Sequence, residues 1–89
     1  FGDLFLAEIR RYREALCQRL GMTPIFPLWE LPTRPLAEEF ISRGYRATVC
    51  CVDARSMMAD CVGRDYDAAF LRSLPEGCDW CGEHGEFHT

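Results

Sequence analysis

The sequence contains no lysine and no asparagine, although it has ten arginines among its 89 residues. We attribute this bias to codon usage, and no mechanism follows from it. No apolar run approaches the roughly 20 residues that a membrane span needs, and the first residues show no secretory signal pattern. A basic excess is also missing, because the net charge is −4, which disfavours a nucleic-acid groove. We therefore expect a cytoplasmic chain that engages neither a membrane nor a nucleic acid.

Length and composition indicate a single globular piece over residues 1–89. The hydrophobic content is 48%, which is typical of folded rather than disordered chains. Six cysteines are present, but Cys17 falls in a helical pattern and the adjacent Cys50 and Cys51 fall in a strand pattern. Adjacent cysteines point to opposite faces of a strand, so that pair cannot easily close on itself. We interpret the cysteines as small buried thiols rather than as a disulfide framework.

Hydrophobic periodicity predicts a first helix from about Leu4 to Leu20, which Gly21 ends. Its charged residues lie mostly off the apolar positions, where we expect a solvated face with ion pairs between Glu14 and the arginines near it. The apolar positions recur at steps of three or four residues and form one stripe: Phe5, Ile9, Tyr12, Leu16 and Leu20.

The rest of the chain predicts an alternation of strands and helices. Residues 23–29 read as a short strand limited by two prolines, and a helix that Thr33 can cap follows and ends at Gly44. Residues 45–52 form a near-continuous apolar strand, which suits a parallel sheet covered on both faces. A third helix runs from about residue 64 to residue 74. The pattern predicts an α/β fold with a partial parallel sheet, flanking helices and a right-handed βαβ unit.

Asp53 directly follows the second predicted strand. Ligands of open α/β folds bind beyond the carboxyl ends of parallel strands, so this carboxylate is a candidate substrate-binding group. The alternative is a loop aspartate that hydrogen-bonds its own turn, and the sequence does not separate the two.

The last eight residues, Gly82 to Thr89, combine two carboxylates, two imidazoles and two glycines. Glycine allows close approach of backbone to a ligand, and Glu and His are the usual proton-transfer side chains. Glu83 and Glu86 could therefore act as an acid/base pair, or they are solvated loop residues. The same region offers four possible zinc ligands, although they are closer together than in common zinc fingers: Cys78, Cys81, His84 and His88. A redox role for the two cysteines would need a helix N-terminus, which the flanking Pro and Gly do not predict.

Several motifs in order resemble the C-terminal half of the diphthine–ammonia ligase family of PP-loop ATP pyrophosphatases. The resemblance spans essentially the whole chain, and the proline-leucine-tryptophan strand end and the closing segment are its most specific parts. The matching residues are Phe1 to Leu6, Arg11 to Glu14, Leu20 to Pro24, Phe26 to Trp29, Gly63 to Asp65 and Cys81 to Thr89.

This resemblance implies a piece of a doubly wound fold of the adenine nucleotide alpha hydrolase type. It also implies ATP, Mg²⁺, and an ammonia-dependent amidation of a carboxylate through an acyl adenylate. The family's Ser-Gly-Gly-x-Asp-Ser phosphate loop is not in this sequence, so we expect a missing N-terminal half or an oligomer partner to supply it. The 89 residues alone would be inactive and would form the substrate-side wall.

On this hypothesis Glu83 and Glu86 are catalytic, and Gly2 and Asp3 lie on the nucleotide side. His84, Phe87 and His88 replace a glycine, a tyrosine and a glutamate of the eukaryotic and archaeal pattern, which indicates a bacterial-type subgroup. Its substrate would be a different carboxylate or no carboxylate at all. Two alternatives remain: a PP-loop protein acting on tRNA or a small molecule, and a small zinc-binding module. The substrate wall would consist of Gly82, Gly85, His88, Thr89 and Asp53.

Overall fold

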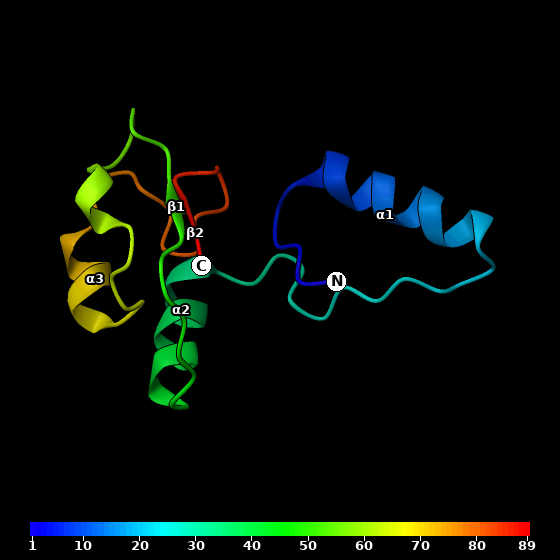
Figure 1. Ribbon diagram of the computed structural model, residues 1–89. Coiled ribbons are helices and arrows are strands. Elements are labelled where there is room, and N and C mark those ends of the chain that lie inside the picture. Colours follow the sequence, from blue (N-terminus) through cyan, green and yellow to red (C-terminus); the bar gives the residue numbers. More distant parts are fainter. The chain divides into compact units, whose positions relative to one another are not determined.

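The computed structural model describes all 89 residues, which form two compact units (Figure 1). Unit 1 is Phe1–Leu31 and unit 2 is Pro32–Thr89. Unit 1 holds one helix, whereas unit 2 holds two helices, a 3-10 turn and two short strands. None of the helices combines the length and the hydrophobicity that a membrane span requires.

Helix α1 (Ala7–Arg19) confirms the first predicted helix. Its end has the geometry of a Schellman motif, because Gly21 has a φ of 65° and two backbone bonds close over the last turn. The Met22 N–H donates to the Cys17 carbonyl at 2.9 Å, and the Gly21 N–H donates to the Gln18 carbonyl at 3.2 Å. The glycine therefore ends the helix where the sequence predicts.

The solvated charged face predicted for α1 is wrong for its central arginines. Arg10 and Arg13 are half-buried, and the Arg10 guanidinium lies over the Phe26 ring at 4.8 Å and the Trp29 ring at 4.6 Å. Arginine packs its stem and its planar cation on aromatic faces, so it can be covered without losing its charge. The predicted ion pair is present, with Arg10 Nε 2.9 Å from Glu14 Oε1.

The predicted strand over residues 23–29 does not form. Pro24 and Pro27 remove two of its backbone donors, and the segment's backbone makes turn bonds instead. The Trp29 N–H donates to the Phe26 carbonyl at 3.2 Å, and the Phe1 ammonium donates to the Ile25 carbonyl at 2.8 Å. These residues therefore close unit 1 as an irregular segment.

Helix α2 (Thr33–Ser42) confirms the second predicted helix, and Gly44 follows its end with a φ of 80°. The capping role predicted for Thr33 is wrong, because Pro32 occupies the N-cap position and no side chain caps the helix. The Thr33 hydroxyl instead donates to Asp79 Oδ2 at 2.7 Å. The hydroxyl therefore bonds a carboxylate distant in sequence instead of accepting a hydrogen bond from the first N–H groups of the helix.

The parallel strand pairing predicted for residues 45–52 is also wrong. The ladder is antiparallel and joins β1 (Cys51–Val52) to β2 (Phe87–His88). An isolated antiparallel bridge joins Thr48 to Asp65. A parallel pair needs a second extended segment, and the proline-containing candidate does not provide one. No βαβ unit forms within these residues, and the larger doubly wound sheet stays a prediction.

Helix α3 (Ala68–Ser73) is shorter than the predicted 64–74 because Asp67 caps it. The Asp67 carboxylate accepts a hydrogen bond from the Phe70 N–H at 2.7 Å, which is the usual device at a helix start. The predicted inward side is confirmed for Tyr66, Phe70 and Leu71, which are all buried.

The core of unit 2 is built around packed aromatic rings. Phe70 is fully buried and meets Phe87 edge-on at 5.2 Å between ring centroids, a favoured geometry for aromatic pairs. The Tyr66 hydroxyl donates to the Trp80 carbonyl at 2.7 Å, and burial raises the pKa of Tyr66. The buried residues of this core are Ala37, Val49, Met57, Tyr66, Phe70, Leu71 and Phe87.

Candidate functional site

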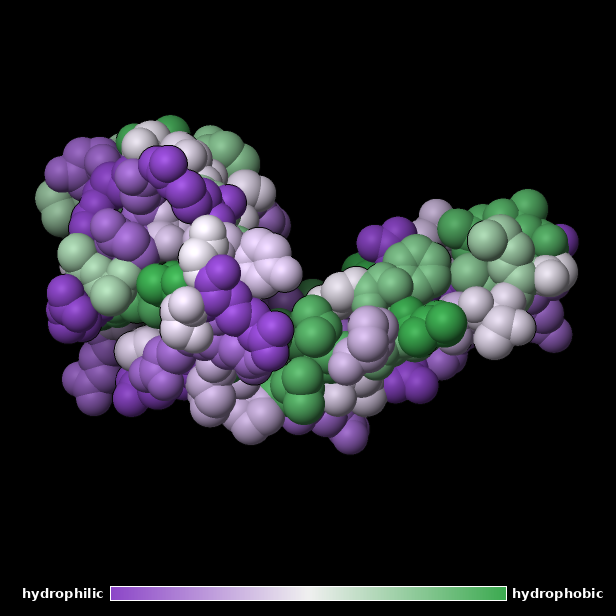
Figure 2. Space-filling model, turned by 90° about the horizontal axis from the view of Figure 1, so that it is seen from below, coloured by the Kyte–Doolittle hydropathy of each residue, from purple (hydrophilic) through white to green (hydrophobic).

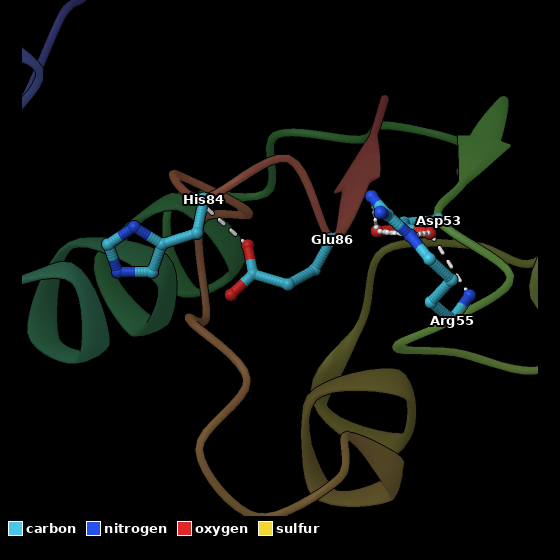
Figure 3. A network of polar contacts seen from close by, with 4 residues as sticks. All are labelled: Asp53, Arg55, His84 and Glu86. Carbon is cyan, nitrogen blue, oxygen red and sulfur yellow. Dashed lines mark hydrogen bonds and ion pairs between the residues drawn. The ribbon is translucent and has the colours of Figure 1, made fainter.

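The closing segment folds around the carboxylate of Glu86, which is only 8% exposed. Its Oε1 accepts a hydrogen bond from the Asp79 N–H at 3.0 Å, and its Oε2 accepts one from the His84 N–H at 3.0 Å. Figure 3 shows the Glu86 side chain reaching toward the backbone of His84. Hydrogen bonds to a carboxylate are stronger than neutral ones. Glu86 therefore holds the loop of residues 79–86 in one conformation.

Asp79 is a second organising carboxylate that the sequence analysis missed. Its Oδ1 accepts from the Cys81 N–H at 2.8 Å and from the Glu83 N–H at 3.3 Å. Its Oδ2 accepts from the Thr33 hydroxyl at 2.7 Å, which ties the loop to the start of α2. The available signal was an aspartate placed before a Cys-Gly turn, since Asp side chains commonly bond the backbone two residues on.

Both glycines of the segment are required by the turn itself. Gly82 has a φ of 69° and Gly85 a φ of 82°, in the left-handed region that favours glycine. Gly82 is also tightly packed, because an added Cβ would lie 2.5 Å from the Phe87 carbonyl oxygen. The close approach predicted for a ligand is thus made by the chain's own backbone at Gly82. Substrate-binding roles for the two glycines stay predictions.

The structure brings most of the other predicted wall residues close to this loop. Glu83 is half-buried and His84 is exposed on the loop itself. His88 and Thr89 are exposed at the chain's end, and the His88 carbonyl accepts from the Cys50 N–H at 2.8 Å. The exposed His84 and half-buried Glu83 are therefore the side chains that a bound molecule could reach from outside.

Asp53 joins the same region through its backbone, since its N–H donates to the Glu86 carbonyl at 2.8 Å. Its carboxylate faces Arg55 (Figure 3), with Oδ2 2.9 Å from the guanidinium. The side-chain hydrogen bond from Arg55 lowers the pKa of Asp53, and the Arg55 N–H adds to this effect. The structure thus shows the turn-forming alternative for Asp53, and its substrate-binding role stays a prediction.

Gly2 and Asp3, predicted for the nucleotide side, lie in unit 1. Gly2 is exposed. Asp3 is half-buried, and its Oδ2 lies 3.7 Å from Nε of Arg13. This separation is within ion-pair range but too long for a hydrogen bond. The contact explains Asp3 as an anchor of α1 within its own unit, and its predicted contact with a nucleotide remains a hypothesis.

A polar cavity of about 280 Å³ opens beside the loop of residues 79–86. Glu86 lines it, together with Cys78 of the preceding turn and Ser56 of the loop after β1. Its size is at the lower end for ligand pockets, which suits a small polar group rather than a whole nucleotide. The remaining lining residues are Pro75, Glu76 and Gly77.

The two cysteines near the loop are held as neutral thiols. Burial raises the pKa of Cys78 to about 11, and the Glu86 carboxylate adds to the shift. Burial likewise raises the pKa of Cys81 to about 11, with the Asp79 carboxylate as the next cause. The Cys81 thiol donates to the Thr33 carbonyl at 3.4 Å. No three or more His, Cys, Asp or Glu side chains come together as a possible metal site, so the zinc alternative gains no support.

Thiol labelling should separate the cysteines by position. All six are free, and Cys50 and Cys51 are exposed, which corrects their prediction as buried thiols. A pKa raised from 9.0 to about 11 lowers the thiolate fraction about 100-fold at pH 8. We expect iodoacetamide to label Cys50 and Cys51 first, and Cys78 and Cys81 about 100-fold more slowly than in urea. Mass spectrometry of digests reads each site.

The raised pKa values of Cys78 and Cys81 also predict how the stability of the fold changes at alkaline pH. Because the folded state favours the protonated thiols of Cys78 and Cys81, their stabilisation is complete below about pH 9 and is lost as the pH rises through about 11. The free energy of unfolding should therefore fall across this range.

The labelling experiment tests the raised thiol pKa values directly. Equal labelling rates of Cys78 and Cys81 in buffer and in urea would contradict them.

No protein-family model, curated protein or solved structure matches this chain. The resemblance to diphthine–ammonia ligases therefore rests on the residues quoted above.

Proposed function

We propose that this chain forms the acceptor-side wall of an ATP-dependent, amide-forming ligase similar to diphthine–ammonia ligases. One observation carries the proposal: residues 79–86 form a loop held by Asp79 and Glu86, with Glu83, His84 and a small polar cavity at its surface. Sites that orient a substrate need such preorganised support, because small misplacements reduce rates strongly. The quoted motifs supply the reaction class.

In the proposed reaction, a carboxylate oxygen of the acceptor attacks the α-phosphorus of ATP and pyrophosphate leaves. Ammonia then attacks the acyl carbon, the carbon–oxygen bond to AMP breaks, and a proton from the nitrogen passes to a base. Glu83 is our candidate for this base, because it is on the loop surface and its backbone is fixed by Asp79. ATP and its Mg²⁺ would be held by residues outside these 89, since the phosphate loop is not in the sequence.

The cavity beside Glu86 suits the small amine of this reaction better than it suits the nucleotide. Two acidic residues line it, Glu86 and Glu76, and negative charge raises the local concentration of ammonium. The tRNA alternative is less well supported. Unit 2 has six arginines against ten acidic residues, and phosphate neutralisation needs the opposite balance.

The proposal is tested with the protein expressed from its complete reading frame. We expect AMP and pyrophosphate to be released from ATP when ammonium chloride and a panel of amino acids and dicarboxylic acids are supplied. Glu83→Gln should lower kcat at least about 100-fold, as expected for loss of a general base, with the melting temperature nearly unchanged. Both readouts are needed, because the unchanged melting temperature separates lost chemistry from lost folding.

The matched control is Glu38→Gln, which makes the same change at an exposed position of α2 that takes no part in the hydrogen bonds of the loop. It should keep wild-type kcat. Release of ADP and phosphate, or wild-type turnover in Glu83→Gln, would reject the proposed ligase function.

A further inference from the structure

Unit 1 exposes a large share of the chain's apolar surface. Nine of the twelve exposed large hydrophobic side chains belong to it, although it is the smaller unit. Figure 2 shows hydrophobic residues gathered on the visible face of this unit. Apolar surface concentrated in this way is a mark of an interaction site. The nine side chains are Phe1, Phe5, Leu6, Ile9, Tyr12, Leu20, Met22, Ile25 and Leu31.

The apolar stripe of α1 consists of Ile9, Tyr12 and Leu16, with Phe5 and Leu20 just beyond the helix ends. Ile9 is 39% exposed and Tyr12 is 59% exposed, whereas Leu16 is half-buried. An amphipathic helix normally turns such a stripe inward, so the stripe indicates a partner.

The unit's own aromatics cover a different face of the helix. Arg10, Arg13, Glu14 and Cys17 are the half-buried and buried positions there, and their spacing places them on one face. The Arg13 guanidinium lies over the Phe1 ring at 5.0 Å. This covered face is about 110° around the helix from the stripe, at about 100° per residue. The aromatic packing therefore leaves Ile9 and Tyr12 exposed.

The charges beside the stripe indicate what covers it. Glu8 in the first turn and Arg19 in the last turn are both exposed. They fall about 20° apart around the helix and so flank the same edge of the stripe. A two-fold axis near the middle of α1 would bring each Glu8 close to Arg19 of a second copy. It would also oppose the two helix dipoles, whereas a parallel pair would bring like charges together.

The other edge of the stripe is compatible with this arrangement. Leu6 and Leu20 lie along it, and the two-fold axis would bring each close to the other residue of the second copy. Arg13 lies between them, but the Phe1 ring covers its guanidinium and Asp3, 3.7 Å from its Nε, offsets its charge. This edge of the stripe therefore has apolar side chains at its ends, and the charge of Arg13 at its centre is offset by Asp3.

A lipid surface fits the stripe less well. Unit 1 has four arginines, Arg10, Arg11, Arg13 and Arg19, against four acidic residues, Asp3, Glu8, Glu14 and Glu30, and so has no net charge. Interfacial helices bind anionic lipids through an excess of basic residues. Self-complementary charge favours a second copy instead.

We propose that the apolar stripe of α1 is the interface of a two-fold symmetric dimer, in which α1 packs antiparallel against α1 of a second copy. This inference is independent of the proposed ligase function. Sedimentation velocity on the 89-residue chain, from about 1 to about 200 µM, covers the range of weak interfaces. We expect the mass to rise from monomer to dimer over this range, with no larger species, because the two-fold contact is closed.

Two sets of variants test the interface itself. Ile9→Glu should weaken dimerisation at least about tenfold, as expected for a charge buried within an interface. The matched control is Gln18→Glu, which adds the same charge at an exposed position about 160° from the stripe and should dimerise normally. The helical signal in circular dichroism should be equal for both variants, which excludes unfolding as the cause.

Charge reversal tests the antiparallel arrangement. Glu8→Arg should weaken the dimer about threefold to tenfold at low salt, since two exposed pairs are lost. The double variant Glu8→Arg with Arg19→Glu should restore it, because the reversed pairs meet again. A monomer at every concentration overturns the proposal, and so does a double variant that dimerises no better than Glu8→Arg alone.

Discussion

Replacing Gly82 by alanine is expected to remove most of the stability of unit 2. The residue has a φ of 69°, and an added Cβ would lie 2.5 Å from the Phe87 carbonyl oxygen. The left-handed conformation costs about 1–2 kcal/mol for a non-glycine residue, and forced overpacking costs about 1–3 kcal/mol more. Phe87 belongs to both β2 and the aromatic core, so its carbonyl cannot move without disturbing them.

Gly85→Ala is the matched control for this prediction. Gly85 has a φ of 82°, but nothing lies within 4 Å of its added Cβ. This variant should therefore lose only the conformational cost of about 1–2 kcal/mol. Urea unfolding followed by circular dichroism gives both free energies. If the two variants lose equal stability, the close contact with Phe87 has no energetic consequence and the packing of the loop is misassigned.

The sequence predicts the helices of this chain well because their ends are encoded locally. Gly21 and Gly44 end α1 and α2 with positive φ, and a glycine after an apolar period is a strong stop signal. The third helix begins later than predicted because Asp67 caps it. A capping aspartate within a helical pattern was present in the sequence, so this boundary was readable.

The strands could not be predicted, because their pairing is not local. Cys51 of β1 pairs with His88 of β2, far along the chain, and each strand has only two residues. Periodicity needs four or more residues to distinguish a strand from other structure. The apolar run over residues 45–52 therefore indicated an extended segment but not its partner or direction.

The composition of the sequence located the candidate site, but it did not predict the hydrogen bonds that hold the site together. Glycine and glutamate near the end of the chain marked the loop, whereas the roles of Asp79 and Glu86 depend on which backbone N–H groups they face. The Thr33 hydroxyl that meets Asp79 comes from another element, and a single sequence does not pair such residues. The covered face of α1 was missed for the same reason, since Arg10 is half-buried only through contact with Phe26 and Trp29.

Truncating Glu86 should be nearly as damaging as the change at Gly82. Glu86→Ala leaves the N–H groups of Asp79 and His84 without their acceptor, and each unsatisfied donor that stays out of water costs about 1–3 kcal/mol. Glu86→Gln keeps one acceptor oxygen but turns an NH₂ group toward the other N–H, so it should lose about 1–3 kcal/mol. Glu76→Gln, at an exposed neighbouring position, should change stability by less than about 0.5 kcal/mol.

Amide hydrogen exchange reports on the same contacts directly. In Glu86→Ala the amides of Asp79 and His84 should lose protection, while the amide of Phe70, bonded to Asp67, should keep it under conditions where unit 2 stays folded. Unchanged protection of both loop amides would show that the Glu86 carboxylate does not hold the loop.

This result also decides how a loss of turnover is interpreted. Glu86→Gln is expected to reduce both stability and turnover, because the Glu86 carboxylate positions the loop by accepting hydrogen bonds from two backbone N–H groups. Glu83→Gln is expected to reduce turnover far more than stability, because glutamine has the same shape and the Asp79 bond to residue 83 uses the backbone N–H and survives the substitution. A positioning role for Glu86 and a proton-transfer role for Glu83 are therefore separable when melting temperature and kcat are measured on the same two variants. If both variants melt as the wild type does and lose turnover equally, Glu86 would join Glu83 as a group that contacts the reacting atoms.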